Sequence, residues 1–551
     1  MYTFDTETSN NGVEAWVWSW ALCDEQLRTV HGNGLNMLDA LTSLPDRSEV
    51  WVHNLTYDGE FVFWELMRRG YKLIYDLYPK DRQHGVFDML IDNSGIISMR
   101  IWTRGRWIML RDSLRIFRCT LEKLPKLCGF ALEETKGIMD YDAMRPRDHV
   151  ASSGEIDYQL RDVRVLMRAM QWLRGQGAKG NTVGAIAVSE FKKSRDNVAP
   201  FAGLTVDQRK QLRSLYNGGV VHAPVTGRVL NVAGRTYDRN SMYPAEAIKP
   251  LPVELTGMYH GVSCAGDIRA YHVQAANVRL HADGFPLLIT PFTGKARESI
   301  PLLDKWLFSA EYEAVRRFYD GDDWHILTTA TFRAEKVCEG FIDKWYTIKS
   351  TEPERRTYAK YVLNNLTGKF GENPIHEQIR RRIEESEDGQ DYFNYRFNEI
   401  DTGVNNWQFM PAVAYITSQS RLCLAGAAIK SGIGNLLYTD TDSVHTTGEL
   451  PASMIDDKRL GAWKCENEFN KAIYIKPKSY AEQRDGVTTA SGHAGVNNDA
   501  TLARWDESTN TYVDTGEIIS FDNMRPGVAY FTRQSRKAQG GIIIERKVKQ
   551  M

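Results

Sequence analysis

The distribution of apolar and polar residues predicts a mixture of strands and helices with polar clusters at their ends. The mostly apolar run Ile433–Leu437 predicts a strand that leads into Asp440 and Asp442. Val225–Tyr237 is strand-like as well, and Glu354–Phe370 has the composition of a helix. The polar residues that follow or line these elements are the first candidates for chemistry.

The segment Tyr438-Thr439-Asp440-Thr441-Asp442-Ser443 places two carboxylates two residues apart. Because extended backbone alternates its side chains, Asp440 and Asp442 are predicted to point the same way. Like charges held that close repel unless cations neutralise them. A polar turn is the alternative, since Asp, Thr and Ser are common in turns and the chain has 70 acidic residues. The full string resembles the metal-binding hairpin in the palm of family-B DNA polymerases, which favours a metal site.

A second segment, Tyr237-Asp238-Arg239-Asn240-Ser241-Met242-Tyr243-Pro244, resembles the D-x-x-S-L-Y-P motif of the same family, with Met242 in the Leu position. The resemblance implies that Asp238 joins Asp440 and Asp442 in holding two divalent cations, Mg²⁺ or Mn²⁺. It also implies that the region of Ser241 contacts the nucleotide triphosphate. Tyr243 would lie under the sugar, where its ring excludes a 2′-hydroxyl.

One face of the helix predicted over 354–370 carries three polar residues spaced by four, namely Arg356, Lys360 and Asn364. Lys360 to Gly368 resembles the K-x-x-x-N-S-x-Y-G fingers motif of the family. The resemblance implies that Lys360 and Asn364 bind the triphosphate, with Lys349 as a second phosphate contact. Asn365 and Thr367 replace the Ser and Tyr of that motif, and a solvated basic face is the alternative.

Three carboxylate motifs follow one another in the first third of the chain: F-D-T-E-T at 4–8, H-N-L-T-Y-D at 53–58 and Y-Q-L-R-D at 158–162. Together they resemble the three exonuclease motifs of the family's proofreading domain. The resemblance implies a 3′–5′ exonuclease with two divalent cations, held by Asp5, Glu7, Asp58 and Asp162. Tyr158 would orient the attacking water, and Lys136, in a Lys-Gly element, would assist.

Other short motifs point to DNA. Lys478-Ser479-Tyr480 resembles the family's K-x-Y element, which contacts the primer. Tyr216-Asn217-Gly218-Gly219 resembles the Y-x-G-G motif of the protein-primed branch, found in small bacteriophages with linear genomes, and implies that Tyr216, Gly218 and Gly219 contact DNA. The same branch implies contacts with single-stranded primer for Thr8, His53, Asn54, Phe61, Ser113 and Leu114. Taken singly, each of these is equally compatible with a core or turn residue.

The motif order predicts an α/β multi-domain chain in which a ribonuclease-H-like exonuclease domain precedes a right-hand polymerase with an antiparallel palm sheet. The expected regions are the exonuclease domain (1–178), a first palm segment (179–250), an insertion specific to the protein-primed branch (251–338), fingers (339–374), a second palm segment (375–480), a short second insertion (481–496), and the end of the palm with a β-rich thumb (497–551). The branch's second insertion closes a ring around DNA. Its shortness here predicts weak unaided strand displacement.

Composition agrees with this interpretation. A length of 551 residues suits three or four domains. No apolar run is long enough to span a bilayer, so we expect a soluble, cytoplasmic protein without membrane contacts. Seven scattered cysteines without C-x-x-C spacing suit a reducing compartment. The formal charge is −1, but arginines gather in Arg100–Arg118, and phosphates respond to local charge.

The sequence therefore predicts a template-directed DNA polymerase with a proofreading exonuclease, which replicates a viral or plasmid genome from a terminal-protein primer. Expected partners are primer-template DNA, single-stranded DNA, deoxynucleoside triphosphates, a terminal protein, and a single-strand-binding or helper protein. Three alternatives stay open: an exonuclease with a decayed polymerase half, a polymerase that uses another primer, and a non-catalytic DNA-binding protein that kept the fold.

Overall fold

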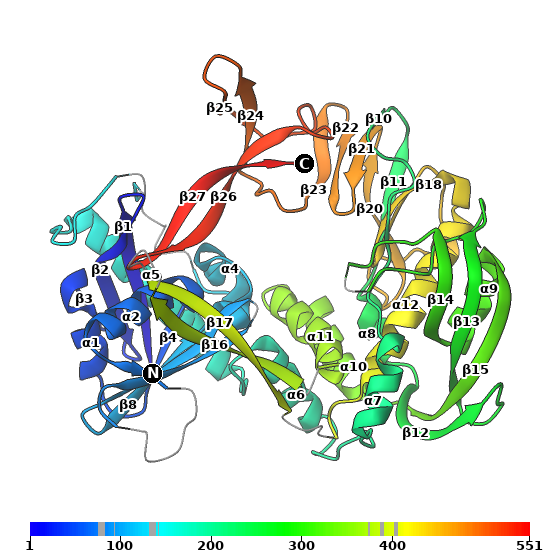
Figure 1. The fold of residues 1–551 in the computed structure, drawn as a ribbon, viewed down its shortest axis with the longest axis horizontal. Helices are drawn as coiled ribbons and strands as arrows, with labels where there is room; N and C mark the ends of the chain where they lie inside the picture. Colours follow the sequence, from blue (N-terminus) through cyan, green and yellow to red (C-terminus); the bar gives the residue numbers. More distant parts are fainter. Residues whose placement is uncertain are drawn as a thin grey trace.

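The computed structural model describes residues 1–551 except 75–82, 93, 132–138, 141–142, 292, 373–374, 386–390 and 402–405. An N-terminal α/β domain is followed by several antiparallel sheets and a pair of helices (Figure 1). The mixed multi-domain fold predicted from the sequence is confirmed.

The N-terminal domain is built on a sheet of eight strands in the order β3-β2-β1-β4-β8-β7-β6-β5. Its strands are β1 (Tyr2–Asn10), β2 (Ala15–Asp24), β3 (Thr29–Asn33), β4 (Ser48–Val52), β5 (Lys72–Leu73), β6 (Val86–Asp92), β7 (Gly95–Thr103) and β8 (Arg106–Asp112). β1, β4 and β8 run parallel, while β1 and β2 are antiparallel. The helices α1 (Met37–Ser43) and α2 (Leu55–Arg68) share a core with one face, where Phe4 lies. The opposite face packs on α5 (Ser153–Gly175), to which Thr3 donates a hydrogen bond.

Local sequence fixes the start of α5. The Ser152 hydroxyl accepts a hydrogen bond from the Glu155 amide, and the Glu155 carboxylate accepts one from the Ser152 amide. This capping box satisfies backbone donors that the first helical turn leaves without partners. The cap fixes the residue at which α5 begins, and Tyr158 and Asp162 are carried by this helix.

The palm sheet comprises five antiparallel strands in the order β20-β11-β19-β18-β9. These are β20 (Trp463–Phe469), β11 (Gly234–Arg239), β19 (Ser443–Thr446), β18 (Leu436–Asp440) and β9 (Val221–His222). The helices α8 (Met242–Ala247) and α12 (Met410–Lys430) lie next to it. A second sheet, β10-β21-β22-β23, stands beside the palm sheet and comprises β10 (Val229–Leu230), β21 (Lys471–Lys476), β22 (Ser479–Arg484) and β23 (Val487–His493).

Two further regions lie between β11 and α12. The first is a four-stranded sheet, β12-β15-β13-β14, with one helix: β12 (Leu251–His260), β13 (Ile268–Leu280), β14 (Ser299–Phe308), α9 (Ser309–Phe318) and β15 (Tyr319–Glu335). The second is the helix pair α10 (Glu339–Thr351) and α11 (Arg356–Phe370), which packs on α6 (Val183–Lys193). In Figure 1 the sheet and the helix pair occupy different sides of the palm.

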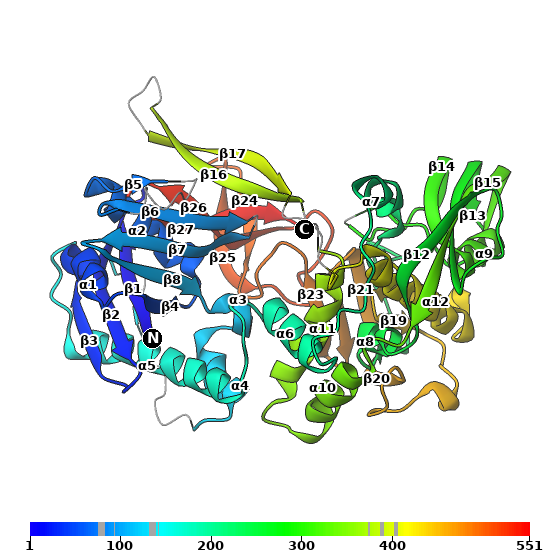
Figure 2. The ribbon, with the colours of Figure 1, turned by 90° about the horizontal axis from the view of Figure 1, so that it is seen from below.

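A long hairpin arm follows α11. Its strands, β16 (Ile375–Glu385) and β17 (Asp391–Asp401), pair in an unbroken antiparallel register. The arm extends to the N-terminal domain, where β16 lies alongside β6 (Figures 1 and 2). These residues fall within the second palm segment (375–480) that was expected from the motif order.

The residues expected as the short second insertion lie in the sheet beside the palm. Residues 481–496 complete β22 and form β23. Asp485 and Gly486 both have positive φ, 52° and 84°, as the tight hairpin turn predicted there requires. The weak unaided strand displacement expected from the shortness of this connection stays a prediction.

The chain ends in the thumb sheet, β25-β24-β26-β27. Its strands are β24 (Thr501–Asp506), β25 (Thr511–Ile518), β26 (Ala529–Ala538) and β27 (Gly541–Gln550). The β26–β27 ribbon reaches across to the N-terminal domain (Figure 1), where Ile543 is buried in that domain's core.

Two composition-based expectations can be compared with the fold. The cysteines Cys119, Cys128, Cys264, Cys338, Cys423 and Cys465 are free. Among the described residues, no helix is both long and apolar enough to cross a membrane.

The arginines of 100–118 are largely engaged within the domain, since Arg111 pairs with Glu49 and Arg115 with Asp92. For these arginines an intramolecular role is favoured over a DNA-binding surface.

Candidate active sites

The palm sheet brings Asp238 and Asp442 together from distant parts of the chain. Asp238 pairs with Ser443 across β11 and β19, and the Arg239 amide donates to the Asp442 carbonyl at 2.9 Å. Burial raises the pKa of Asp238 to about 7, and the neighbouring Asp442 carboxylate adds to the shift. Burial and Asp440 likewise raise the pKa of Asp442. Two partly buried carboxyls that disfavour each other's ionisation are well suited to a cation.

Asp440 has a different partner. Lys478 Nζ donates to both oxygens of its carboxylate at 2.8 Å, and the Tyr438 hydroxyl donates at 3.2 Å. The prediction that Asp440 and Asp442 lie on one face of a strand is wrong, because Thr441, at φ 60°, turns the chain between β18 and β19. Among the described residues, no three His, Cys, Asp or Glu side chains form a cluster that could hold a metal ion.

A group of cations lies next to the palm carboxylates. Lys349 Nζ donates to Ser241 Oγ at 2.6 Å, which joins α10 to the start of α8. Burial lowers the pKa of Lys349 to about 8, and the nearby charges of Lys360 and Arg356 lower it further. Asn364 is exposed on the same face of α11 as these two side chains. Crowded cations of this kind favour an anion with several charges, such as a triphosphate.

Tyr243 lies between this region and the Y-x-G-G loop. Burial raises the pKa of its hydroxyl to about 12, and the nearby charge of Asp442 contributes. The loop approaches the β18–β19 hairpin closely: the Thr441 amide donates to the Val220 carbonyl at 2.9 Å. A Cβ on Gly219 would lie 2.6 Å from Thr441 Oγ1, so the position requires glycine. Gly218 also belongs to this loop, and Tyr216, at its start, is 45% exposed.

A buried arginine that no motif analysis identified holds this loop in place. Arg421 on α12 donates to the carbonyls of Asn217 and Gly218 at 2.7 and 2.8 Å, and it pairs with Glu311 of α9. Lys305 on β14 donates to Asn217 Oδ1 at 2.8 Å. The available sequence signal is an arginine in a helix, Met410–Lys430, whose one other charged residue is Lys430 at its end.

The N-terminal carboxylates gather at the start of α2. The Thr6 amide and hydroxyl both donate to Asp58 Oδ1, at 3.2 and 2.5 Å. Burial raises the pKa of Asp58, and the Asp112 carboxylate adds to the increase. Burial also raises the pKa of the Tyr57 hydroxyl to about 12, with contributions from Asp58, Glu7 and Asp5. These three carboxylates therefore all lie near the Tyr57 hydroxyl.

The fourth carboxylate, Asp162, lies on α5 with the buried Tyr158. Its neighbour Val163 accepts the Thr3 hydrogen bond at 2.7 Å, which fixes α5 against β1, the strand of Asp5 and Glu7. Lys136, predicted to assist this site, lies outside the described residues.

The remaining predicted DNA contacts lie around the same site. His53 is bonded to Ser113 Oγ at 3.0 Å and to the Cys119 carbonyl at 2.9 Å. Asp112, which no motif identified, accepts from the amides of Asn54 and Leu114. Asn54 and Leu114 line a cavity of about 530 Å³ that is bounded on the other side by Asn365 and Lys369 of α11. Thr8 Oγ1 lies 2.6 Å from the Tyr57 hydroxyl.

Comparison with known proteins identifies the chain. Residues 153–406 match the family of type B DNA polymerases, organellar and viral. The DNA polymerase of Bacillus phage phi29 is 26% identical over 518 residues, which cover 88% of this chain and 86% of that protein. The DNA polymerase of Streptococcus phage Cp-1 is 22% identical over 590 residues, covering 98% and 97%. The chain is a DNA polymerase that is similar, over most of its length, to the type B enzymes of these phages.

The solved structures agree with the polymerase fold. Phi29 DNA polymerase complexed with primer-template DNA and incoming nucleotides superposes with a TM-score of 0.84 at 22% identity, covering 100% of this chain and 99% of that one. Its complex with single-stranded DNA also gives a TM-score of 0.84, at 23% identity. The arrangement of domains in this polymerase is therefore that of phi29 DNA polymerase.

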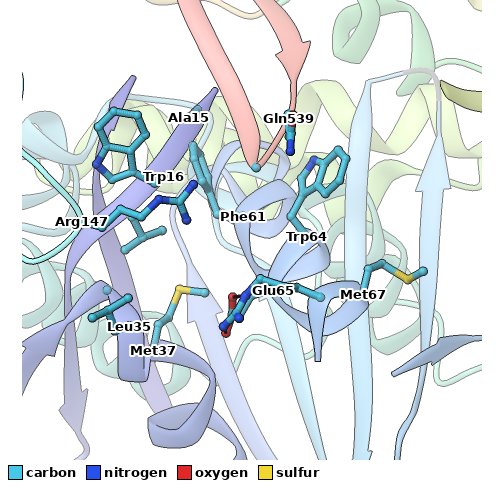
Figure 3. A pocket seen from close by; sticks show the side chains of 14 residues that line it. Ala15, Trp16, Leu35, Met37, Phe61, Trp64, Glu65, Met67, Arg147 and Gln539 are labelled. Carbon is cyan, nitrogen blue, oxygen red and sulfur yellow. Dashed lines mark hydrogen bonds and ion pairs between the residues drawn. The ribbon is translucent and has the colours of Figure 1, made fainter. Parts of the chain in front are cut away.

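The thumb of the polymerase docks on the exonuclease-like domain. The Ala15 amide donates to the Gln539 carbonyl at 2.9 Å, and Lys537 pairs with Glu60 at 3.2 Å. Beside this junction is a pocket of about 480 Å³, in which Phe61 and Trp64 lie below Gln539 (Figure 3). Phe61, predicted to contact single-stranded primer, is 2% exposed and covered by the thumb in this structure.

Gly540 closes this junction, and its replacement by Ala should loosen it. Gly540 has φ 83°, and a Cβ there would lie 2.1 Å from the Ala15 carbonyl oxygen. Strain at positive φ costs about 1 kcal/mol, and the backbone clash adds to it. We expect the β26–β27 ribbon to be cut several-fold faster in limited proteolysis. Gly527→Ala is the matched control, because Gly527 has φ 78° and open space around it. Equal cleavage of the two variants would contradict the docking.

Proposed function

We propose that this DNA polymerase carries two separate reaction sites, one for nucleotide addition in the palm and one for 3′–5′ hydrolysis in the N-terminal domain. The observation that carries the proposal is the convergence of Asp238 and Asp442 beside the cations Lys349, Lys360 and Arg356. It supports binding of a polyanionic nucleotide beside a pair of carboxylates that require a counter-cation.

Divalent cations fit both sites. Mg²⁺ is commonly bound by one or two protein carboxylates together with substrate phosphates, so Asp238 and Asp442 suffice in the palm without a third carboxylate. In the N-terminal domain Asp5, Glu7, Asp58 and Asp162 would hold such ions. When bound, they would neutralise charge on the reacting phosphate and its leaving oxygen. The pairing of Asp440 with Lys478 supports a role for Asp440 in placing Lys478.

In the palm, the primer 3′ oxygen attacks the α-phosphorus of the nucleotide, and the bond to the β-phosphate breaks to release pyrophosphate. Lys360, Lys349 and Asn364 would orient the triphosphate, with Ser241 held by Lys349. Lys478 and Tyr480 would hold the primer end, and the loop of Tyr216, Gly218 and Gly219 would support the DNA beside Thr441. Because proximity and orientation account for much of catalysis, these contacts govern the rate.

In the N-terminal domain, water attacks the last phosphodiester and releases a nucleoside monophosphate. Tyr158 would orient that water. Asn54, Leu114 and Thr8 would guide the single strand, with His53 and Ser113 fixing the wall of the path through their mutual hydrogen bond. The cavity shared with α11 gives such a strand a route between the two sites.

Tyr243 provides a test of sugar selection. A ring under C2′ excludes a hydroxyl by steric conflict. We expect Tyr243→Val to raise the frequency of ribonucleotide incorporation at least tenfold while deoxynucleotide addition continues. The measurement is single-nucleotide extension with each nucleotide type, and Tyr243→Phe, which keeps the ring, is the matched control. If the Val variant discriminates as well as the parent, Tyr243 does not have this role.

We further propose that replication begins on a protein primer, as the Y-x-G-G loop and the sheet of β12–β15 support by their resemblance to the protein-primed branch. The test is to incubate the polymerase, Mg²⁺ and one labelled deoxynucleotide with candidate proteins encoded beside it. Label joined covalently to a Ser, Thr or Tyr hydroxyl of one of them is the expected result. If the polymerase extends DNA or RNA primers but labels no protein, the proposal of protein priming fails while the polymerase function stands.

A further inference from the structure

A fully buried carboxylate that belongs to none of the motifs lies behind the palm. Glu482 on β22 has an exposed fraction of 0%. Its Oε1 accepts from the Tyr474 hydroxyl at 2.8 Å and lies 2.5 Å from His445 Nδ1. Its Oε2 accepts from Thr236 Oγ1 at 2.8 Å and from Asn467 Nδ2 at 2.9 Å. Both oxygens are therefore saturated by protein groups.

The four partners come from four different strands: Thr236 from β11, His445 from β19, Asn467 from β20 and Tyr474 from β21. Three of these strands belong to the palm sheet, whereas β21 and β22 belong to the neighbouring sheet. One carboxylate thus joins the two sheets. Burying a charge is costly unless it is paired and hydrogen-bonded, so the network has one low-energy arrangement.

Three of the joined strands, β11, β19 and β22, carry or adjoin proposed functional residues. Thr236 precedes Asp238 by two positions, and His445 follows Asp442 by three. Glu482 itself follows Tyr480 by two positions and Lys478 by four. The carboxylate therefore connects the strands of the palm carboxylates to the strand of the proposed primer contacts.

The rings around His445 reinforce this connection. Tyr438 and Tyr480 lie edge-on to the imidazole, with ring centroids 5.0 and 5.1 Å away. The Tyr438 hydroxyl accepts from the Lys478 amide at 2.9 Å and donates to Asp440. His445 Nε2 lies 3.4 Å from Ser443 Oγ, in the residue next to Asp442. A displacement of the His445 ring would therefore affect Tyr480, a proposed primer contact, and also Ser443, next to Asp442.

We propose that Glu482, acting through His445, is a positioning residue that holds the primer end in register with the palm carboxylates. It touches neither substrate nor the proposed metal ligands. The inference rests on the proposed function of Lys478 and Tyr480 as primer contacts.

The test uses Glu482→Gln in the full chain. An amide presents a donor where the carboxylate accepts, so at least one of the four donors loses its partner. A loosely held primer end should leave the palm more often and be hydrolysed. We expect the deoxynucleotide concentration at which net extension overtakes degradation of a matched primer to rise at least tenfold. Degradation of single-stranded DNA should stay within twofold of the parent.

Tyr474→Phe and Glu190→Gln complete the experiment. Tyr474→Phe keeps the ring and the carboxylate but removes one hydrogen bond, so it should shift the balance in the same direction by a smaller factor. If Glu482→Gln does not fold, Tyr474→Phe tests the positioning role in its place. Glu190→Gln changes another buried, ion-paired carboxylate, 6% exposed, and should leave the balance unchanged.

An unshifted balance in both palm variants would overturn the positioning role. So would an equal loss of both activities in Glu482→Gln and Glu190→Gln, which would indicate a general loss of stability. Asp442→Asn, assayed alongside, separates this result from failure of the proposed palm site. If Asp442→Asn still extends primers, the palm assignment is wrong, whatever Glu482→Gln does.

Discussion

Primer extension should be lost in Asp442→Asn, while degradation of single-stranded DNA continues. The substitution keeps the size of the side chain and removes the carboxylate charge that lies near Asp238. Loss of electrostatic stabilisation of about 4 kcal/mol corresponds to a rate decrease of roughly 10³-fold. The measurement is single-turnover extension of a labelled primer with saturating nucleotide and Mg²⁺.

Asp457→Asn is the matched control for this experiment, because Asp457 is exposed and lies outside both sites. It should extend at the parental rate. If Asp442→Asn extended within tenfold of the parent, the nucleotide-addition site would not depend on this carboxylate.

The doubly substituted chain Asp5→Ala, Glu7→Ala should behave in the opposite way. These carboxylates lie on β1, far from the palm in the fold, and with Asp58 they surround the Tyr57 hydroxyl. Without them the site would lose two of its four proposed cation ligands, and with them the charge that would neutralise the phosphate. We expect removal of a mismatched 3′ nucleotide to fall by roughly 10³-fold or more, and extension of a matched primer to continue.

The mismatch assay is decisive because it uses both sites in turn. A primer with one unpaired 3′ nucleotide should be trimmed and then extended by the parent but should stall in the double variant. Trimming at an unchanged rate would place the hydrolytic site elsewhere in the chain.

Much of the site could be predicted from local sequence. The motifs around Asp238, Asp442 and Asp58 place each carboxylate near the end of a strand or the start of a helix, and the fold brings Asp238 close to Asp442. The spacing of Arg356, Lys360 and Asn364 gave one exposed helix face for the same reason, since helical periodicity is local.

The rest depends on tertiary contacts that no short pattern encodes. Asp440 pairs with Lys478, 38 positions later, so the D-x-D spacing gave no hint that the two carboxylates have different partners. Thr441 adopts a positive φ because the two-strand turn requires it, against the preference of a β-branched residue. Arg421 and Glu482 are buried charges whose partners lie on other elements.

The hairpin arm shows a different limitation. Its residues lie where resemblance to the family is thin, and Asp388-Gly389 is a turn signal between a charged run with isoleucines at every fourth position (375–385) and a run rich in Tyr and Phe (391–401). That pattern predicts a hairpin. The arm was nevertheless not predicted from the sequence. The family's second insertion was expected after the K-x-Y element, so no arm was looked for at 375–401.

The central claim is that one chain both copies a template and removes the nucleotides it has added. The most direct measurement follows a 5′-labelled primer on a defined template with Mg²⁺, first without nucleotides and then with only those that the next few template positions require. The account predicts shortening in the first case and, in the second, extension that stops where the first missing nucleotide is needed. A primer that shortens but is never extended, or that is extended without regard to the template, would contradict it.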